Sequence, residues 1–202
     1  MSFTARLAAQ AALLGLVALT SACATKDSWM GADKEKTYDT ELNAKRLAEG
    51  LNNDDYFEIR KDNSLYVLAD AKGYKIWLAT GEIPLMVTKF RVGPNGEKAK
   101  YALTKNESKA METIVGYKGG AQNLYEGNIQ GISKGFFGLV QVEDGSYYVF
   151  DNWAALSGFR KSGTASGFTA SNGPNGAKVI YVGASSEPKE LAAKFAGLHD
   201  GK

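Results

Sequence analysis

Few side chains in this chain of 202 residues could take part in covalent chemistry. The sequence contains one cysteine, Cys23, and one histidine, His199, which lies close to the C-terminus. A Ser-His-Asp or Cys-His arrangement would have to be built on that histidine, in a region where chains are usually mobile. One cysteine and one histidine also cannot form a site rich in these ligands, so we expect no metal and no cofactor.

Carboxylate chemistry remains open, because two Asp or Glu side chains can act as acid and base in glycan hydrolysis. Glu143, Asp144 and Asp151 are the candidates. Asp144 falls at an expected turn and Asp151 at an expected helix start, and these structural roles explain both residues. No nucleophile, base and orienting group occur together, so we expect that the protein is not an enzyme. A carboxylate-dependent glycan hydrolase stays the least favoured alternative.

Cationic and apolar residues alternate between positions 89 and 101. The period of two predicts a hairpin, turning at Gly93–Gly96, that carries all four cations on one face. Like charges opposite each other are unfavourable, so an anionic lipid, another phosphate-bearing ligand or the acidic segment 24–55 should compensate them. The competing explanation is an edge strand protected from aggregation by lysine. The candidate ligand-binding residues are Lys89, Arg91, Lys98 and Lys100.

The first 22 residues have the pattern of an export signal. Arg6 precedes an apolar run of about a dozen positions, which ends near Leu19 and is too short to be a convincing membrane span. Small residues then lead to Cys23. This arrangement resembles the lipobox of bacterial lipoproteins, with Thr20 where that family prefers Leu. The resemblance implies removal of residues 1–22 and acylation of Cys23, for example with palmitate. With Ala24 as the next residue, it also implies transfer to the outer membrane, on the periplasmic or the surface side.

An alternative to acylation stays open, because Ala22-Cys23-Ala24 also fits the A-x-A pattern of ordinary signal cleavage. Cleavage after Ala24 would discard the cysteine and release the chain from the membrane. An unpaired cysteine in an exported protein is otherwise a free reactive thiol, which favours the acylated form.

The charge balance argues against nucleic-acid binding. Removing residues 1–22 takes away only Arg6, so 24 basic residues become 23, against 22 acidic residues. A nucleic-acid binder would be more basic. The charge is unevenly distributed, with −3 in residues 24–55 and +5 in residues 60–109.

An internal repeat organises the remaining chain. The motif DNSLYV at 62–67 returns as DGSYYV at 144–149, which is an offset of 82. The motif GPNG at 93–96 recurs at 173–176, an offset of 80, and Tyr101 then matches Tyr181. GPNG alone would be ordinary turn chemistry, but an ordered series over some 60 residues indicates a duplication.

Each copy predicts the same series of elements. Strands at about 56–61 and 137–143 are followed by strands at 65–69 and 147–150. Asp70 and Asp151-Asn152 can cap a helix, Gly81 and Gly163 can end it, and its apolar residues recur every three positions. A hairpin at GPNG and a closing helix, from near Asn106 and from near Ser185-Ser186, complete the unit.

We therefore expect an α+β fold of two tandem ββαββα pseudo-repeats, with antiparallel sheets packed against helices, in residues 56–115 and 136–198. Residues 23–55 should form the acylated start, a polar tether and a short helix near 37–51. The glycine-rich connector, 116–135, should hold a small hairpin around Gly127.

The expected function is that of a non-catalytic binding or scaffolding lipoprotein, held in the bacterial envelope by acylated Cys23. Its partner would be an envelope component or another protein. The alternative is recognition of an anionic glycan or a lipid phosphate through the basic hairpin. The aromatic residues of the strands and helices could stack on sugars, but their regular spacing favours core packing.

Overall fold

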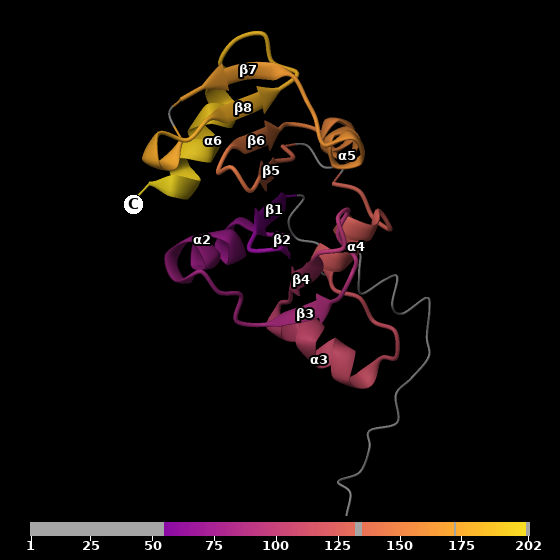
Figure 1. The fold of residues 1–202 in the computed structure, drawn as a ribbon. Helices are drawn as coiled ribbons and strands as arrows, with labels where there is room; N and C mark the ends of the chain where they lie inside the picture. The colour runs from indigo at the N-terminus through magenta and orange to yellow at the C-terminus, as the bar shows by residue number, and fades with distance from the viewer. Residues whose placement is uncertain (1–54, 132–134, 172, 201–202) are drawn as a thin grey trace, which may run out of the picture. The chain divides into compact units, whose positions relative to one another are not determined.

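The computed structural model describes residues 55–131, 135–171 and 173–200 (Figure 1). These residues form an α/β fold with one mixed eight-stranded sheet and five α-helices. The first half contains β1 (Tyr56–Lys61), β2 (Ser64–Leu68), α2 (Ala71–Thr80), β3 (Met86–Lys89), β4 (Lys98–Ala102) and α3 (Lys105–Thr113). Then come α4 (Gly120–Glu126), β5 (Gly138–Gln141), β6 (Tyr147–Phe150), α5 (Trp153–Ser162), β7 (Gly167–Ala170), the 3-10 turn η1 (Pro174–Gly176), β8 (Val179–Val182) and α6 (Lys189–His199). Cys23 and the expected helix near 37–51 lie outside the described residues.

The strand order is β3-β4-β2-β1-β5-β6-β8-β7, so each half of the sheet contains the same sequence of neighbours, counted outward from the centre. The expectation of antiparallel sheets is wrong. The pairs β1–β5, β2–β4 and β6–β8 are parallel, and the other four pairs are antiparallel. The connection through the helix and the edge strand brings β4 back beside β2 in the same direction, and a hairpin cannot do this.

Local chemistry explains the elements that the sequence predicted. The turn between β1 and β2 consists of Asp62 (φ 52°) and Asn63 (φ 54°), the left-handed pair that a two-residue hairpin requires. Asp70 accepts a hydrogen bond from the Gly73 amide at 2.6 Å and caps α2, and Asn152 caps α5 in the same way. Both helices end at a left-handed glycine, as predicted.

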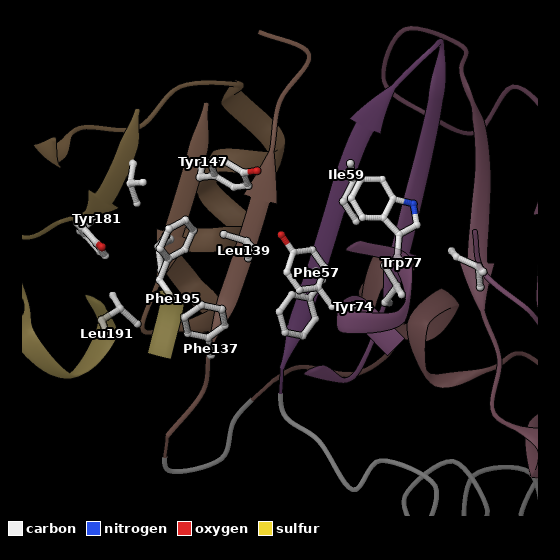
Figure 2. Close-up of a cluster of buried hydrophobic side chains, with 14 residues drawn as sticks. Phe57, Ile59, Tyr74, Trp77, Phe137, Leu139, Tyr147, Tyr181, Leu191 and Phe195 are labelled. Carbon is white, nitrogen blue, oxygen red and sulfur yellow. The ribbon is translucent and has the colours of Figure 1, made fainter. Parts of the chain in front are cut away.

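Two apolar clusters lie on the two faces of the sheet, and each draws side chains from both halves. Helices α2 and α6 cover one face, where Phe57 stacks on Tyr74 with ring centroids 4.7 Å apart (Figure 2). Helices α4 and α5 cover the other face, which carries Tyr56 and Val140. The two halves therefore share their cores, and the expected burial of the helical stripes is confirmed.

The connector departs from the prediction. In place of a hairpin around Gly127, residues 120–126 form helix α4, and Gly127 ends it with φ 76°. Ala121 and Leu124 of α4 pack on Leu65, Ala99 and Tyr101. These three positions match Tyr147, Val179 and Tyr181 of the second half, on which α6 packs. Helix α4 therefore takes the place that the closing helix occupies in the second half, while α3 buries only Glu107.

His199 is the last residue of α6, whereas the sequence suggested a position beyond the last helix, and both of its ring nitrogens have partners. Its Nδ1 lies 2.8 Å from the Phe195 carbonyl oxygen, and its Nε2 lies 3.0 Å from the Tyr74 hydroxyl. A carbonyl oxygen can only accept, so Nδ1 carries the proton and Tyr74 donates to Nε2. The contact connects the end of α6 to α2, and burial raises the pKa of Tyr74.

We expect His199→Ala to lower the free energy of unfolding by about 1–3 kcal/mol, because it leaves the buried Tyr74 hydroxyl without this partner. Tyr74→Phe removes the hydroxyl itself and should cost less. Urea denaturation of the two single variants and the double variant measures the coupling free energy between the two side chains. Costs that simply add would contradict a direct contact between the two side chains.

Candidate functional site

The structure does not bring the four predicted cations together on one face. Lys89 pairs with Ala99, whereas Lys100 pairs with Thr88, so Lys89 and Lys100 point to opposite faces of the sheet. The cause is one extra residue on the β3 side of the loop. The amides of Val92 and Gly93 both donate to the Glu97 carbonyl oxygen at 3.1 Å, which is the pattern of a β-bulge and shifts the register by one.

The cations also differ in what they contact. Lys100 donates to the Tyr66 hydroxyl at 3.1 Å and lies 4.5 Å from the centre of that ring, so it has a structural partner. Arg91 and Lys98 line a hollow of about 230 Å³ together with Asp62. Arg91 has a left-handed backbone, with φ 58°. Of the four residues, only Arg91 and Lys98 line this hollow.

The loop that carries Arg91 is held by a buried carboxylate. Glu97 accepts hydrogen bonds from the Asn95 amide at 2.7 Å and from the Asn95 side chain at 3.0 Å. Burial raises the pKa of Glu97, but these bonds and one from its own amide outweigh that effect and leave the pKa below its ordinary value. The second half has Ala177 at this position, so this support belongs to the first half alone.

The carboxylates considered for glycan hydrolysis do not converge. Asp144 lies in the turn between β5 and β6, where hydrogen bonds from Ser146 hold its pKa below the usual range. Asp151 follows the other end of β6 and accepts a hydrogen bond from Asn152. Six residues of mostly extended chain lie between them and place them roughly 20 Å apart, well beyond the roughly 5–9.5 Å of paired glycosidase carboxylates. Glu143 is exposed beside Asp144.

A charged cluster that the sequence did not predict lies under α4 and α5. Glu58, 1% exposed on β1, accepts from Arg60 at 2.8 Å and from the Tyr56 hydroxyl at 2.6 Å. Arg160 of α5 lies 3.3 Å from the same carboxylate and also donates to the Tyr125 carbonyl oxygen of α4. The cluster therefore connects the centre of the sheet to both helices. Burial, followed by the charge of Glu58, raises the pKa of Tyr56.

The alternation of polar residues in β1 concealed this cluster. Glu58 and Arg60 stand two positions apart, a pattern typical of a solvent-facing strand surface. Two helices cover that surface in the fold, and nothing local to β1 indicates them.

A crevice of about 600 Å³ opens at the carboxyl ends of the parallel strands β2 and β4. The starts of α2, α3 and α4 border it. Crevices of this kind, outside the carboxyl ends of parallel strands, are common ligand sites in α/β sheets. Most of its wall is apolar, and it includes Leu68, Ile76, Ile83, Pro84, Leu85 and Leu103. We call this cavity the crevice.

The polar groups at the base of the crevice already have partners. Asp70 caps α2, and Thr104 caps α3 by accepting from the Glu107 amide at 3.2 Å. The Glu107 carboxylate accepts from the amides of Thr104 at 2.6 Å and Gly120 at 2.5 Å, so it caps α4 as well as completing the capping box of α3. Protein side chains already accept hydrogen bonds at all three helix starts, and most of the wall is apolar, so the crevice suits an apolar group. Lys72 and Lys105 are the cations of its lining.

The large apolar side chains that are exposed in the described residues all lie between positions 76 and 92. Ile76 and Leu85 form part of the crevice wall, Met86 lies in the edge strand β3, and Phe90 and Val92 lie in the loop that follows it. Exposed large apolar side chains gathered in one segment make that segment a candidate interaction site. The sequence showed the cations of this segment, but it did not show that its apolar residues would be exposed.

Comparison of the chain with protein-family models, curated proteins and solved structures found no match. None of the described helices combines the length and the hydrophobicity needed to cross a bilayer. Within the same residues, no group of three or more His, Cys, Asp or Glu side chains could hold a metal ion.

Glu58→Gln should lower the free energy of unfolding by about 3 kcal/mol, because it removes the buried carboxylate that pairs with Arg60 and the partly buried Arg160. Adding Arg160→Leu should recover part of this loss, since an apolar side chain of similar extent needs no partner. Guanidinium denaturation of the single and double variants provides the comparison. If Glu58→Gln is as stable as the parent chain, the cluster does not hold α5 on the sheet.

Proposed function

We propose that this chain is a lipid-anchored protein of the bacterial cell envelope and that its folded domain is a non-catalytic binding module. The anchor is acylated Cys23, which follows an export signal in residues 1–22 and a lipobox-like run of small residues. Two or more acyl chains give stable attachment to a bilayer, because each buried methylene contributes about 0.8 kcal/mol. Outer-membrane placement follows from the same resemblance.

The crevice is the observation that carries the binding role. Its apolar wall opens to solvent through Ile76 and Leu85, each 36% exposed. A cavity of about 600 Å³ lies within the range of small-molecule sites, which are mostly apolar with a few polar groups. The partner is then an apolar part of an envelope component or of another protein.

The hydrogen bonds and ion pairs made by the acidic side chains support a non-catalytic role. Glu107, which borders the crevice, accepts backbone hydrogen bonds at two helix starts, and the buried Glu58 is paired with two arginines. A general acid or base needs a carboxylate with access to substrate and a tuned pKa. These carboxylates instead have structural partners that hold the fold together.

We further infer that the two halves are tandem copies of one ββαββ unit. The motifs match in order, and the strand pairings of the first half are repeated in the second. The GPNG loops share their hydrogen bonds, with Gly96 donating to Gly93 at 2.9 Å and Gly176 donating to Gly173 at 3.0 Å. Both halves have the predicted order ββαββα, but the closing helices pack differently: α6 covers the sheet in the second half, whereas α4 takes that place in the first half and α3 buries only Glu107.

Cys23→Ser should release the protein from the membrane fraction of a Gram-negative host, because the serine cannot receive the thioether-linked lipid. The parent chain should stay with the outer membrane and should show, by mass spectrometry, a start at Cys23 with added acyl mass. A parent chain that starts at Thr25 and is recovered in the soluble periplasm would contradict the anchor.

The uncharged dye N-phenyl-1-naphthylamine should bind in the crevice and fluoresce more strongly there. Leu85→Gln should weaken this binding about tenfold, since losing a buried apolar contact of this size costs about 1.5 kcal/mol. Val92→Gln is the matched control, because Val92 is similarly exposed (39%) but does not line the crevice. Equal effects of the two substitutions would show that the dye binds elsewhere.

A further inference from the structure

Exposed apolar surface in the described residues gathers along the first edge of the sheet. Leu85 is 36% exposed, Met86 45%, Phe90 76% and Val92 39%. All four belong to residues 85–92, which contain β3 and the start of the loop that follows it. We call residues 85–92 the β3 edge surface.

The β3 edge surface is also positively charged. Lys89 and Arg91 alternate with the apolar residues, and Lys98 lies beside Phe90 and Arg91 in the hollow. No acidic residue stands between Glu82 and Glu97, and Glu97 is buried and hydrogen-bonded within its own loop. Edge-strand protection explains the lysines but not the exposed phenylalanine and methionine, which make an edge more prone to aggregation.

The second half of the sheet shows that the fold does not require this surface. Its edge strand β7 carries Phe168 partly buried against the core, and Lys89 corresponds to Ala170. The loop after β7 has two residues before GPNG, Ser171 and Asn172, where the first half has three. The additional residue of the first half forms the bulge that exposes Phe90 and gives Arg91 its left-handed backbone.

We propose that the β3 edge surface docks the domain onto an anionic lipid surface. Along β3 the alternation places Met86 and Lys89 on opposite faces of the sheet, so it is the edge of the sheet that presents apolar and cationic side chains together to a bilayer interface. There the apolar groups enter the headgroup boundary and the cations pair with phosphates. This single occupant accounts for the apolar residues, the cations and the lack of acidic residues in positions 83–96 together. Asp62, in the neighbouring turn, is the acidic residue that lines the hollow with Arg91 and Lys98. An acidic protein partner would also match the cations, but its binding would have no connection with a membrane anchor near the start of the chain.

This proposal rests on the proposed anchoring for its cellular setting, but it is tested without the anchor. Asp55 follows Cys23 by 32 residues, which span at most about 110 Å when fully extended. An attachment of that maximum length holds the domain near the membrane but does not determine which face of the domain meets the lipid. The β3 edge surface then selects the face that meets the lipid.

The test uses the chain from residue 23 onward with Cys23→Ser, which cannot be acylated. Flotation with vesicles of phosphatidylcholine alone and of phosphatidylcholine mixed equally with phosphatidylglycerol measures binding. We expect binding to the anionic vesicles only, weakening as salt is raised because the charges are exposed. No binding to anionic vesicles, or equal binding to both kinds, would overturn the proposal and leave the anchor untouched.

Three variants separate the contributions within the β3 edge surface. The double variant Lys89→Gln, Arg91→Asn should weaken binding to anionic vesicles about 25-fold, because each lost cation should cost about fivefold. Asn is chosen at position 91 because it tolerates the left-handed backbone. Phe90→Ser should also weaken it, with little change in its salt dependence. Lys161→Gln with Lys178→Gln removes two exposed cations from the second half and should leave binding unchanged. Equal thermal midpoints for all three would show that the fold is kept.

A single cysteine reports which face meets the lipid, because Cys23 is the only natural one. A polarity-sensitive dye on Met86→Cys should shift to the blue on anionic vesicles, whereas the same dye on Lys178→Cys should not. Equal shifts would overturn the proposed orientation. A dimer in sedimentation that Phe90→Ser dissociates would show that a second copy of the chain covers the surface, and this too would overturn the proposal.

Discussion

The parallel pairing of β1 with β5 is the constraint on which the rest of the structure depends. It joins the two halves of the sheet through their first strands, and the strand order counted outward from this pair is the same in both halves. Because the joined strands run in the same direction while the strand order is mirrored, equivalent helices fall on opposite faces of the sheet. Helix α2 covers one face and α5 the other, and each apolar cluster contains residues of both halves. Each cluster continues across the β1–β5 junction, so the two halves share their cores.

The candidate sites lie where the first half of the fold differs from the second. Helix α4 replaces the closing helix on Leu65 and Tyr101, and Glu107 connects the starts of α3 and α4. With α3 moved away from the sheet, the carboxyl ends of β2 and β4 border the crevice. One additional residue before GPNG produces the bulge and the exposed β3 edge surface. The first half thus carries both candidate binding features, while the second half completes the core.

The buried charge of Glu58 connects the central strand of the sheet to two helices. Glu58, paired with arginines of β1 and α5, lies at the central strand and reaches α4 through Arg160. A buried ion pair contributes little net stability by itself, but breaking it is costly, so it favours one arrangement of the two helices over others. His199 makes a comparable connection on the opposite face, between α6 and α2.

Much of this protein was determined by the sequence itself. The capped helices α2 and α5 and the turns of the GPNG hairpins depend on residues within a few positions of one another, and such interactions can be recognised in a sequence. Tertiary structure alone decided the parallel pairs, the packing of α4, the burial of Glu58 and the separation of Lys89 from Lys100. These depend on which surfaces meet across long stretches of chain, and a shift of one residue in register turns a strand's side chains to the other face.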